Sequence, residues 1–163
     1  EPARFAVLVH DLGKALTPAD TLPRHVGHEQ RGIEPARGLA ERLKVPAEHR
    51  ELGVLVCAHH LVMHQLVTLR ASTLMRLLER LDGLRRPDRV RRFALACEAD
   101  HRGRLGREHV DYPQRELLLR ALEAARGVQA SALLNQGLSG PALGAALRQA
   151  RIRAIAATLR GPD

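Results

Sequence analysis

The feature that most constrains the fold is the spacing of apolar residues, which recur every three to four positions, while alternating runs of β-branched or aromatic residues are missing. This spacing is typical of helices that bury one face, so we expect an all-α bundle. The 163 residues suit a single domain, and 45% of them are hydrophobic, enough for one core. The expected helices cover residues 3–14, 28–43, 47–63, 71–83, 87–103, 112–126, 129–136 and 139–159.

Prolines mark several of the expected helix boundaries. Pro46, Pro87 and Pro141 stand where a helix can begin, since the first turn tolerates a residue without an N–H. The segment 16–27 contains two further prolines among Thr, Asp and Gly residues and is expected to be a loop. Pro35 falls inside the expected helix 28–43, so it either kinks that helix or marks a late start.

The chain is strongly basic. Lys and Arg total 26 against 18 Asp and Glu, the formal charge is +8, and Lys14 and Lys44 are the only lysines. Such an excess favours a polyanionic partner, and guanidinium groups suit bidentate contacts to phosphate. A coding bias toward Arg and Ala explains the same numbers equally well, so charge alone does not decide the function.

Cysteine use and hydropathy indicate a reducing compartment. Cys57 and Cys97 each lie in an apolar run, where a free thiol packs as a small hydrophobic group, and neither belongs to a CxxC pair. We recognise no signal peptide and no apolar run long enough to cross a bilayer, so we expect a cytoplasmic protein without a disulfide. The chain opens EPARFAVLVH, without Met, as expected of a fragment.

The run FAVLVHDLGK holds the first candidate site residues. His10 and Asp11 follow five apolar residues, and a buried carboxylate is costly unless a positive group neutralises it. A divalent cation meets that need, whereas a hydrogen-bonded His–Asp pair near a helix end is the alternative. Lys14 follows Asp11 by three residues, about one helical turn along the same side, where it would meet a phosphate held on the metal.

Histidines supply further candidate ligands. The chain has nine, and five of them lie in the runs RHVGHE and AHHLVMH: His25, His28, His59, His60 and His64. His60 and His64 share one face of a helix, as would His25 and His28 if their segment is helical. Imidazoles that converge on an aspartate suit zinc, manganese, iron or nickel. For any single histidine a solvated or core position is the alternative, and we expect His49 and His109 to be of that kind.

Asp100, in ALACEADHRGR, is a second candidate carboxylate. It lies three residues past Cys97 on the face that carries Phe93, so we expect it to point inward and to close a coordination sphere from a distant helix. An exposed or arginine-paired aspartate is the alternative. Candidate residues for holding a phosphate anion are Arg24, Arg102 and Arg104.

Four segments, HDLGK, LPRHVGHEQRG, AHHLVMH and EADHRGRLG, together resemble the HD domain fused to bacterial CCA-adding tRNA nucleotidyltransferases. The similarity runs over most of the chain, through DYPQRELL to GLSGPALGAALRQARIRAI. It implies an HD-type helical bundle and a metal-dependent phosphohydrolase acting on 2′,3′-cyclic nucleotides, 2′-nucleotides and phosphomonoesters. The nucleotidyltransferase site of these enzymes lies in an N-terminal head that is not recognisable here, so we expect no CCA addition from this chain alone.

The resemblance also assigns site residues. It matches the His–Asp pair to His10 and Asp11 and the distal aspartate to Asp100. Additional metal ligands or phosphate contacts are expected at His28, His59 and His60. We expect catalysis by His10, Asp11 and Lys14, with the phosphate at Lys14, Arg24 and Arg104. The resemblance also implies a divalent metal as cofactor, and nickel, manganese, magnesium and zinc all stay open.

One departure from the HD pattern concerns the first ligand. HD proteins typically take a first histidine from the helix before the His–Asp pair, and no histidine precedes His10 here. Either that ligand lies upstream of this chain or another group takes its place. The metal site is therefore expected to be incomplete, weak or empty.

Two hypotheses other than hydrolysis stay open. In the first, the chain is a tRNA-binding domain that contacts backbone phosphates; in the second, it is a domain that holds a homodimer together. We expect residues 1–110 to form the HD phosphohydrolase core and residues 111–163 a C-terminal helical region packed on it, with a tRNA contact. The arginines expected at that contact, for which a solvated basic face is equally plausible, are Arg148, Arg151, Arg153 and Arg160.

Overall fold

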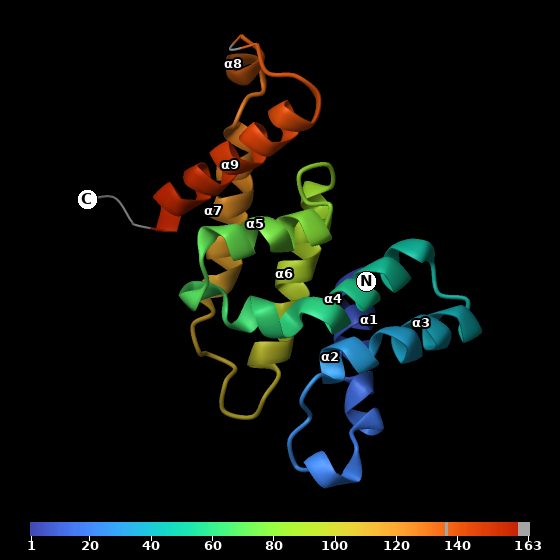
Figure 1. The fold of residues 1–163 in the computed structure, drawn as a ribbon. Helices are drawn as coiled ribbons and strands as arrows, with labels where there is room; N and C mark the ends of the chain where they lie inside the picture. The colour runs from blue at the N-terminus through green and yellow to red at the C-terminus, as the bar shows by residue number, and fades with distance from the viewer. Residues whose placement is uncertain (136, 160–163) are drawn as a thin grey trace. The chain divides into compact units, whose positions relative to one another are not determined.

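The computed structural model describes residues 1–135 and 137–159, and every regular element in these ranges is helical, which confirms the all-α class. The 3₁₀ helices are Leu12–Leu16 (η1), Ala19–Thr21 (η2) and Leu66–Thr68 (η3). The α-helices are Pro2–Val9 (α1), His28–Arg31 (α2), Ile33–Arg42 (α3), Ala47–His64 (α4), Ala71–Arg80 (α5), Pro87–Arg102 (α6), Pro113–Gly127 (α7), Ser131–Leu134 (α8) and Gly140–Leu159 (α9) (Figure 1). Within the described ranges, none of these helices has the length and apolar character needed to cross a membrane.

Prolines stand at or near the start of several helices, at three of them as the sequence predicted. Pro87 is the first residue of α6, Pro141 is the second residue of α9, and α4 begins directly after Pro46. The first N–H groups of a helix have no partner inside it, so a residue without an N–H costs nothing there and its fixed φ favours the helix. Pro113 begins α7 for the same reason.

The prediction of one helix over residues 3–14 is wrong in its second half. Helix α1 ends at Val9, and Asp11 has φ −103° and ψ 7°, outside the helical region, before η1 begins. The tighter turn brings the backbone of Gly13 against α2, where a Cβ on Gly13 would lie 1.9 Å from the carbonyl oxygen of His28. A regular helix through Gly13 is therefore replaced by a close approach of two backbones.

The helix expected over 28–43 is two helices, α2 and α3, that meet at Gly32. A Cβ on Gly32 would lie 2.6 Å from the Cys57 sulfur, so this position also needs a residue without a side chain. Pro35 is the third residue of α3, inside its first turn. Helix α3 thus begins shortly before Pro35, and a late helix start was one of the two outcomes predicted for this proline.

Two helix ends depend on residues in the left-handed region. Lys44 has φ +52° and Asp82 has φ +51°, a conformation uncommon for residues other than glycine. The following N–H groups close the helices, with Val45 donating to Ala40 at 2.9 Å and Gly83 donating to Leu78 at 2.8 Å. Helix α5 therefore ends at Arg80, short of the predicted residue 83, and α8 is likewise shorter than predicted.

The chain divides into two compact units. The first unit comprises Glu1–Gln65 and Arg91–Arg115, and the second comprises Leu66–Val90 and the chain from Glu116 onward. The predicted boundary between residues 110 and 111 stays a prediction. Residue 136 and residues 160–163, which include Arg160 and the end of the expected C-terminal region, lie outside the described residues.

In the first unit, α4 packs against α1, α2 and α3 (Figure 1). Fully buried side chains of this unit are Val9, Val56, Met63, Phe93 and Cys97. In the second unit α9 packs against α5 and α8, and its fully buried side chains include Leu74, Leu78, Leu118, Leu122 and Ile155. Apart from Phe93, these fully buried side chains are aliphatic or carry sulfur, as the composition requires.

Candidate metal centre

Five of the predicted site residues converge in the first unit, from the end of α1 and from α2, α4 and α6. We call them the metal centre: His10, Asp11, His28, His60 and Asp100. Asp11 lies in the middle, with Oδ2 3.3 Å from the Nε2 atom of His10 and Oδ1 3.2 Å from the Nε2 atom of His28. The same Oδ1 is 3.8 Å from the Nε2 atom of His60. Asp100 reaches the Nε2 atom of His10 with Oδ1 at 3.2 Å.

The imidazoles of His10, His28 and His60 each contact a backbone carbonyl oxygen through Nδ1, the ring nitrogen that does not face Asp11. The Nδ1 atom of His10 lies 2.7 Å from the Val7 carbonyl oxygen, and that of His28 lies 2.7 Å from the His25 carbonyl oxygen. The Nδ1 atom of His60 lies 3.0 Å from the Cys57 carbonyl oxygen. A carbonyl oxygen only accepts, so each Nδ1 carries a proton, and in the neutral rings each Nε2 offers a lone pair to the centre.

This arrangement fits a cation. The Nε2 atoms of His28 and His60 are 3.2 Å apart, and two lone pairs at that distance repel unless a positive group lies near them. The Nε2 atom of His10 and Oδ1 of Asp11 are buried without a hydrogen-bond partner of good geometry. Ligand atoms of His10, Asp11 and His60 all lie within 4.8 Å of one another. Imidazole nitrogens with a carboxylate are a donor set for a divalent transition metal, and each ring is already oriented by its backbone contact.

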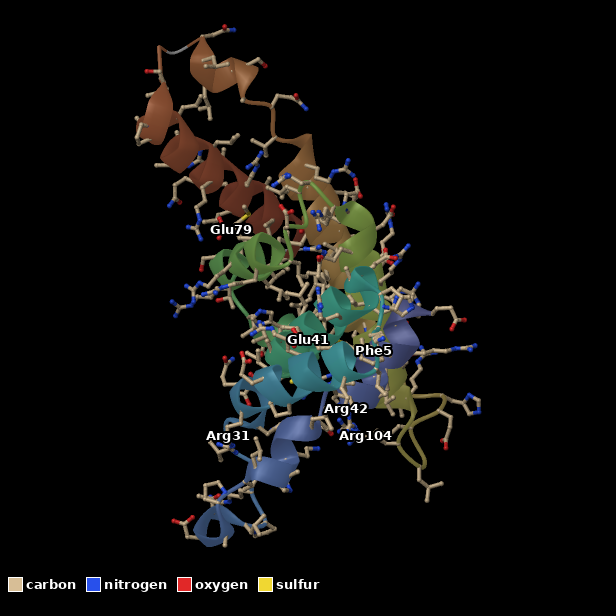
Figure 2. The ribbon with its side chains drawn as sticks, turned by 90° about the vertical axis from the view of Figure 1, so that its right-hand side faces the viewer. Phe5, Arg31, Glu41, Arg42, Glu79 and Arg104 are labelled. Carbon is tan, nitrogen blue, oxygen red and sulfur yellow. The ribbon has the colours of Figure 1, made fainter. Side chains whose placement is uncertain are left out.

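Two cationic side chains border the centre. Lys14 places Nζ 2.5 Å from Oδ2 of Asp11. Arg104, which is labelled in Figure 2 and lies just beyond the end of α6, places Nη2 3.2 Å from Oδ2 of Asp100. Their side chains are 40% and 52% exposed, so both charges reach solvent. Each of these two side chains therefore places a positive charge beside one carboxylate of the centre.

The charges of the centre alter the acidity of its members. Burial lowers the pKa of His10, but the Asp100 and Asp11 carboxylates outweigh it and raise the pKa to about 10. Burial raises the pKa of both aspartates, yet the contacts of His10 with each of them hold their pKa values well below the ordinary 3.8. Burial and the charge of His10 lower the pKa of His60. In the metal-free chain His10 is therefore protonated, and its positive charge lies between the carboxylates of Asp11 and Asp100.

We predict a specific pH dependence for the metal-free chain. Because the pKa of His10 is raised in the folded state, its contribution to the free energy of unfolding is complete below pH 6.5 and is lost as the pH rises toward about 10. Urea unfolding in the presence of a chelator, compared between the wild type and His10→Asn, should show a difference in stability that falls across this window. A difference that stays constant from pH 6.5 to 10 would contradict the assigned contacts.

The other predicted residues lie less centrally. His25 precedes α2 and pairs its Nδ1 with the Thr17 hydroxyl at 2.7 Å, so it does not share a helix face with His28. His59 stands one residue before His60 on α4, and successive helical residues point about 100° apart. Arg24 is exposed in the loop after η2. The roles predicted for His59 and Arg24 stay predictions.

Two more residues lie near the centre: His64, which the sequence analysis named only as one of the clustered histidines, and Tyr112, which received no role there. His64 lies with Nε2 2.8 Å from Oδ2 of Asp100 and with Nδ1 2.9 Å from the Tyr112 hydroxyl. The shared helix face of His60 and His64 was recognisable, but the contact with Asp100 requires the fold. Tyr112 is the only tyrosine of the chain, yet its surroundings in a polar segment gave no sign that it would be buried.

The fold and the centre together define an all-α protein with a candidate metal site built from a His–Asp pair, two further histidines and a distal aspartate. Residues 1–102 match the HD domain family, and the chain belongs to that family. No solved structure matches the chain.

The chain is also similar to longer proteins. It is 57% identical over 153 residues to the Multifunctional CCA protein of Stenotrophomonas maltophilia strain K279a, covering 94% of this chain and 38% of that protein. It is 54% identical over 156 residues to the protein of that name from Xanthomonas euvesicatoria pv. vesicatoria, covering 96% and 38%. It is 53% identical over 161 residues to the Multifunctional CCA protein of Halorhodospira halophila, covering 99% of this chain and 39% of that protein. The chain thus spans less than two fifths of the length of these relatives.

Proposed function

We propose that this chain is a metal-dependent phosphohydrolase that acts on 2′,3′-cyclic nucleotides, 2′-nucleotides and phosphomonoesters. The observation that carries the proposal is the convergence of three imidazole Nε2 atoms and two carboxylates beside two solvent-reaching cations. The similarity to Multifunctional CCA proteins supports a place in the C-terminal part of a CCA-adding tRNA nucleotidyltransferase. The HD domain match supports the hydrolytic reaction.

The residues of the centre take distinct roles in this proposal. His10, Asp11 and Asp100 hold the metal, with His28 and His60 as further ligands and His59 as a ligand or phosphate contact. When bound, a divalent metal such as nickel, manganese, magnesium or zinc polarises a phosphoryl oxygen and favours ionisation of a water molecule. Lys14 and Arg104 offset the negative charge that develops on the phosphate, and Arg24 approaches it from the loop.

The charge of Lys14 gives the proposal a test. Lys14→Met keeps most of the apolar stem and removes the ammonium, so hydrolysis of a 2′,3′-cyclic nucleotide should fall by about 10²-fold in kcat/KM with metal content unchanged. Lys44→Met is the matched control, because Lys44 is the only other lysine and lies two residues beyond the last residue of α3. Both variants are assayed with added Mn²⁺ and analysed for bound metal.

Three outcomes are distinguishable. Hydrolysis that is unchanged in Lys14→Met shows that the phosphate is held elsewhere. Loss of metal together with activity makes Lys14 a support of Asp11 instead of a phosphate contact. Absence of metal-dependent hydrolysis in the unsubstituted chain, against all three substrate classes, contradicts the proposed reaction itself.

A tRNA contact is the second candidate function, favoured by the charge of +8 and by the names of the relatives. Among the C-terminal arginines, Arg148 already donates to both carboxylate oxygens of Glu79, at 2.7 and 3.1 Å, so it favours a structural role. Arg153 is exposed on α9. A salt-dependent affinity for tRNA that survives Asp11→Asn and falls with Arg153→Ala would support binding independent of hydrolysis.

A further inference from the structure

The two carboxylate oxygens of Asp100 have different partners. Oδ1 faces the metal centre, 3.2 Å from the Nε2 atom of His10. Oδ2 lies 2.8 Å from the Nε2 atom of His64 and 3.2 Å from Nη2 of Arg104. The side chain is only 9% exposed, so these contacts fix its rotation. Whatever holds Oδ2 therefore determines where Oδ1 points.

His64 is in turn held by Tyr112. The Tyr112 hydroxyl lies 2.9 Å from the Nδ1 atom of His64, and this tyrosine is 5% exposed. A carboxylate oxygen only accepts, so the Nε2 atom of His64 carries the proton toward Asp100. In the neutral ring Nδ1 is then an acceptor, and the hydroxyl donates to it. The tyrosine thereby selects the tautomer that donates to Asp100.

The backbone around His64 is fixed as well. His64 is the last residue of α4, where carbonyl groups have no helical partner, and the side chain of Gln114 donates to its carbonyl oxygen at 3.0 Å. Gln114 and Tyr112 flank Pro113, the first residue of α7. One short segment therefore holds both the ring and the main chain of His64.

We infer that His64 and Tyr112 are positioning residues for the metal centre, in which Tyr112 fixes the tautomer of His64 and His64 holds Oδ2 of Asp100 so that Oδ1 is presented to the metal. The inference rests on the proposed role of Asp100 as a ligand. It gives His64 a function that neither the His–Asp pair nor the match to the HD domain family assigns.

The test is Mn²⁺ binding, followed by electron paramagnetic resonance of the free ion, so that no activity is needed. His64→Ala should weaken Mn²⁺ affinity by about 10- to 100-fold, as is typical when a group that orients a ligand is removed. His64→Gln should recover most of that loss, because its amide N–H still donates to Asp100. His109→Ala, which removes an exposed histidine, is the matched control and should bind as the wild type does.

Tyr112→Phe separates the tautomer effect from packing, since it removes only the hydroxyl. In the wild-type background it should weaken Mn²⁺ affinity by less than about 10-fold, below the loss for His64→Ala. In the His64→Gln background it should change little, because an amide has no tautomer to select. Such non-additivity is expected of two residues that act through one hydrogen-bonded chain.

The outcomes separate this inference from the proposed function. Wild-type affinity in His64→Ala, or no recovery in His64→Gln, overturns the positioning role. Unchanged affinity in Asp100→Asn contradicts instead the ligand assignment of the proposed function. Circular dichroism checks the fold of each variant, and if His64→Ala is unfolded, the decision falls to Tyr112→Phe in its two backgrounds.

Discussion

Asp11→Asn should abolish tight binding of divalent metal and reduce hydrolysis by at least about 10²-fold, although the side chain keeps its shape. Asp11 is the carboxylate that approaches the Nε2 atoms of all three imidazoles, at 3.3, 3.2 and 3.8 Å. An amide removes the negative charge and cannot present two acceptor oxygens to the centre. The loss should therefore appear in metal content as well as in turnover.

The matched control for this variant is Asp20→Asn, which makes the same chemical change on an exposed residue of η2. Metal content is measured by mass spectrometry after dialysis, and turnover is measured with a 2′,3′-cyclic nucleotide. Full metal content in Asp11→Asn would show that the histidines bind without this carboxylate. Equal losses in both variants would point to a general effect of charge.

Gly13→Ala should lower the free energy of unfolding by more than the roughly 1–3 kcal/mol that overpacking usually costs. The added Cβ would lie 1.9 Å from the carbonyl oxygen of His28 and 2.6 Å from the nitrogen of Gly32. These are backbone atoms, which cannot rotate away as a flexible side chain does. Helix α2 would have to separate from η1, and His28 would leave the metal centre with it.

Gly38→Ala is the control for the glycine variant. Gly38 lies inside α3 with no atom within 4 Å of the added Cβ, so the change should stabilise the chain by about 0.5–1 kcal/mol. Denaturant unfolding of both variants measures the contrast. A Gly13→Ala chain as stable as the wild type would mean that η1 and α2 do not make the close backbone contact.

The helical class and most helix starts could be predicted from the sequence because they depend on local features. Apolar spacing locates helices, and prolines such as Pro46 and Pro87 mark where they begin. The breaks at Asp11 and Gly32 could not be predicted in this way. They arise because Gly13 and Gly32 pack backbone against backbone, and a contact between separate segments leaves no trace in local periodicity.

The candidate site could be predicted in part. His10, Asp11 and Asp100 were identified from apolar flanks and helix faces, and the fold brings them together with His28 and His60. His25 was grouped with His28 by spacing, but α2 starts too late to place both on one face. The contacts of His64 depend on how close α4 lies to α6 and to the segment before α7, which no motif records.

The most direct test of the metal centre is the response of the nine histidines to metal in the nitrogen-15 spectrum of the labelled chain. Zn²⁺, which is diamagnetic, is added stepwise to the chelator-treated chain. The Nε2 signals of His10, His28 and His60 should shift, while their Nδ1 signals should stay at the position of a protonated nitrogen. The signals of His49 and His109 should not change at the same ratio of metal to protein. Shifts confined to exposed histidines, or a first equivalent of Zn²⁺ that leaves His10 and His60 unchanged, would contradict the metal centre.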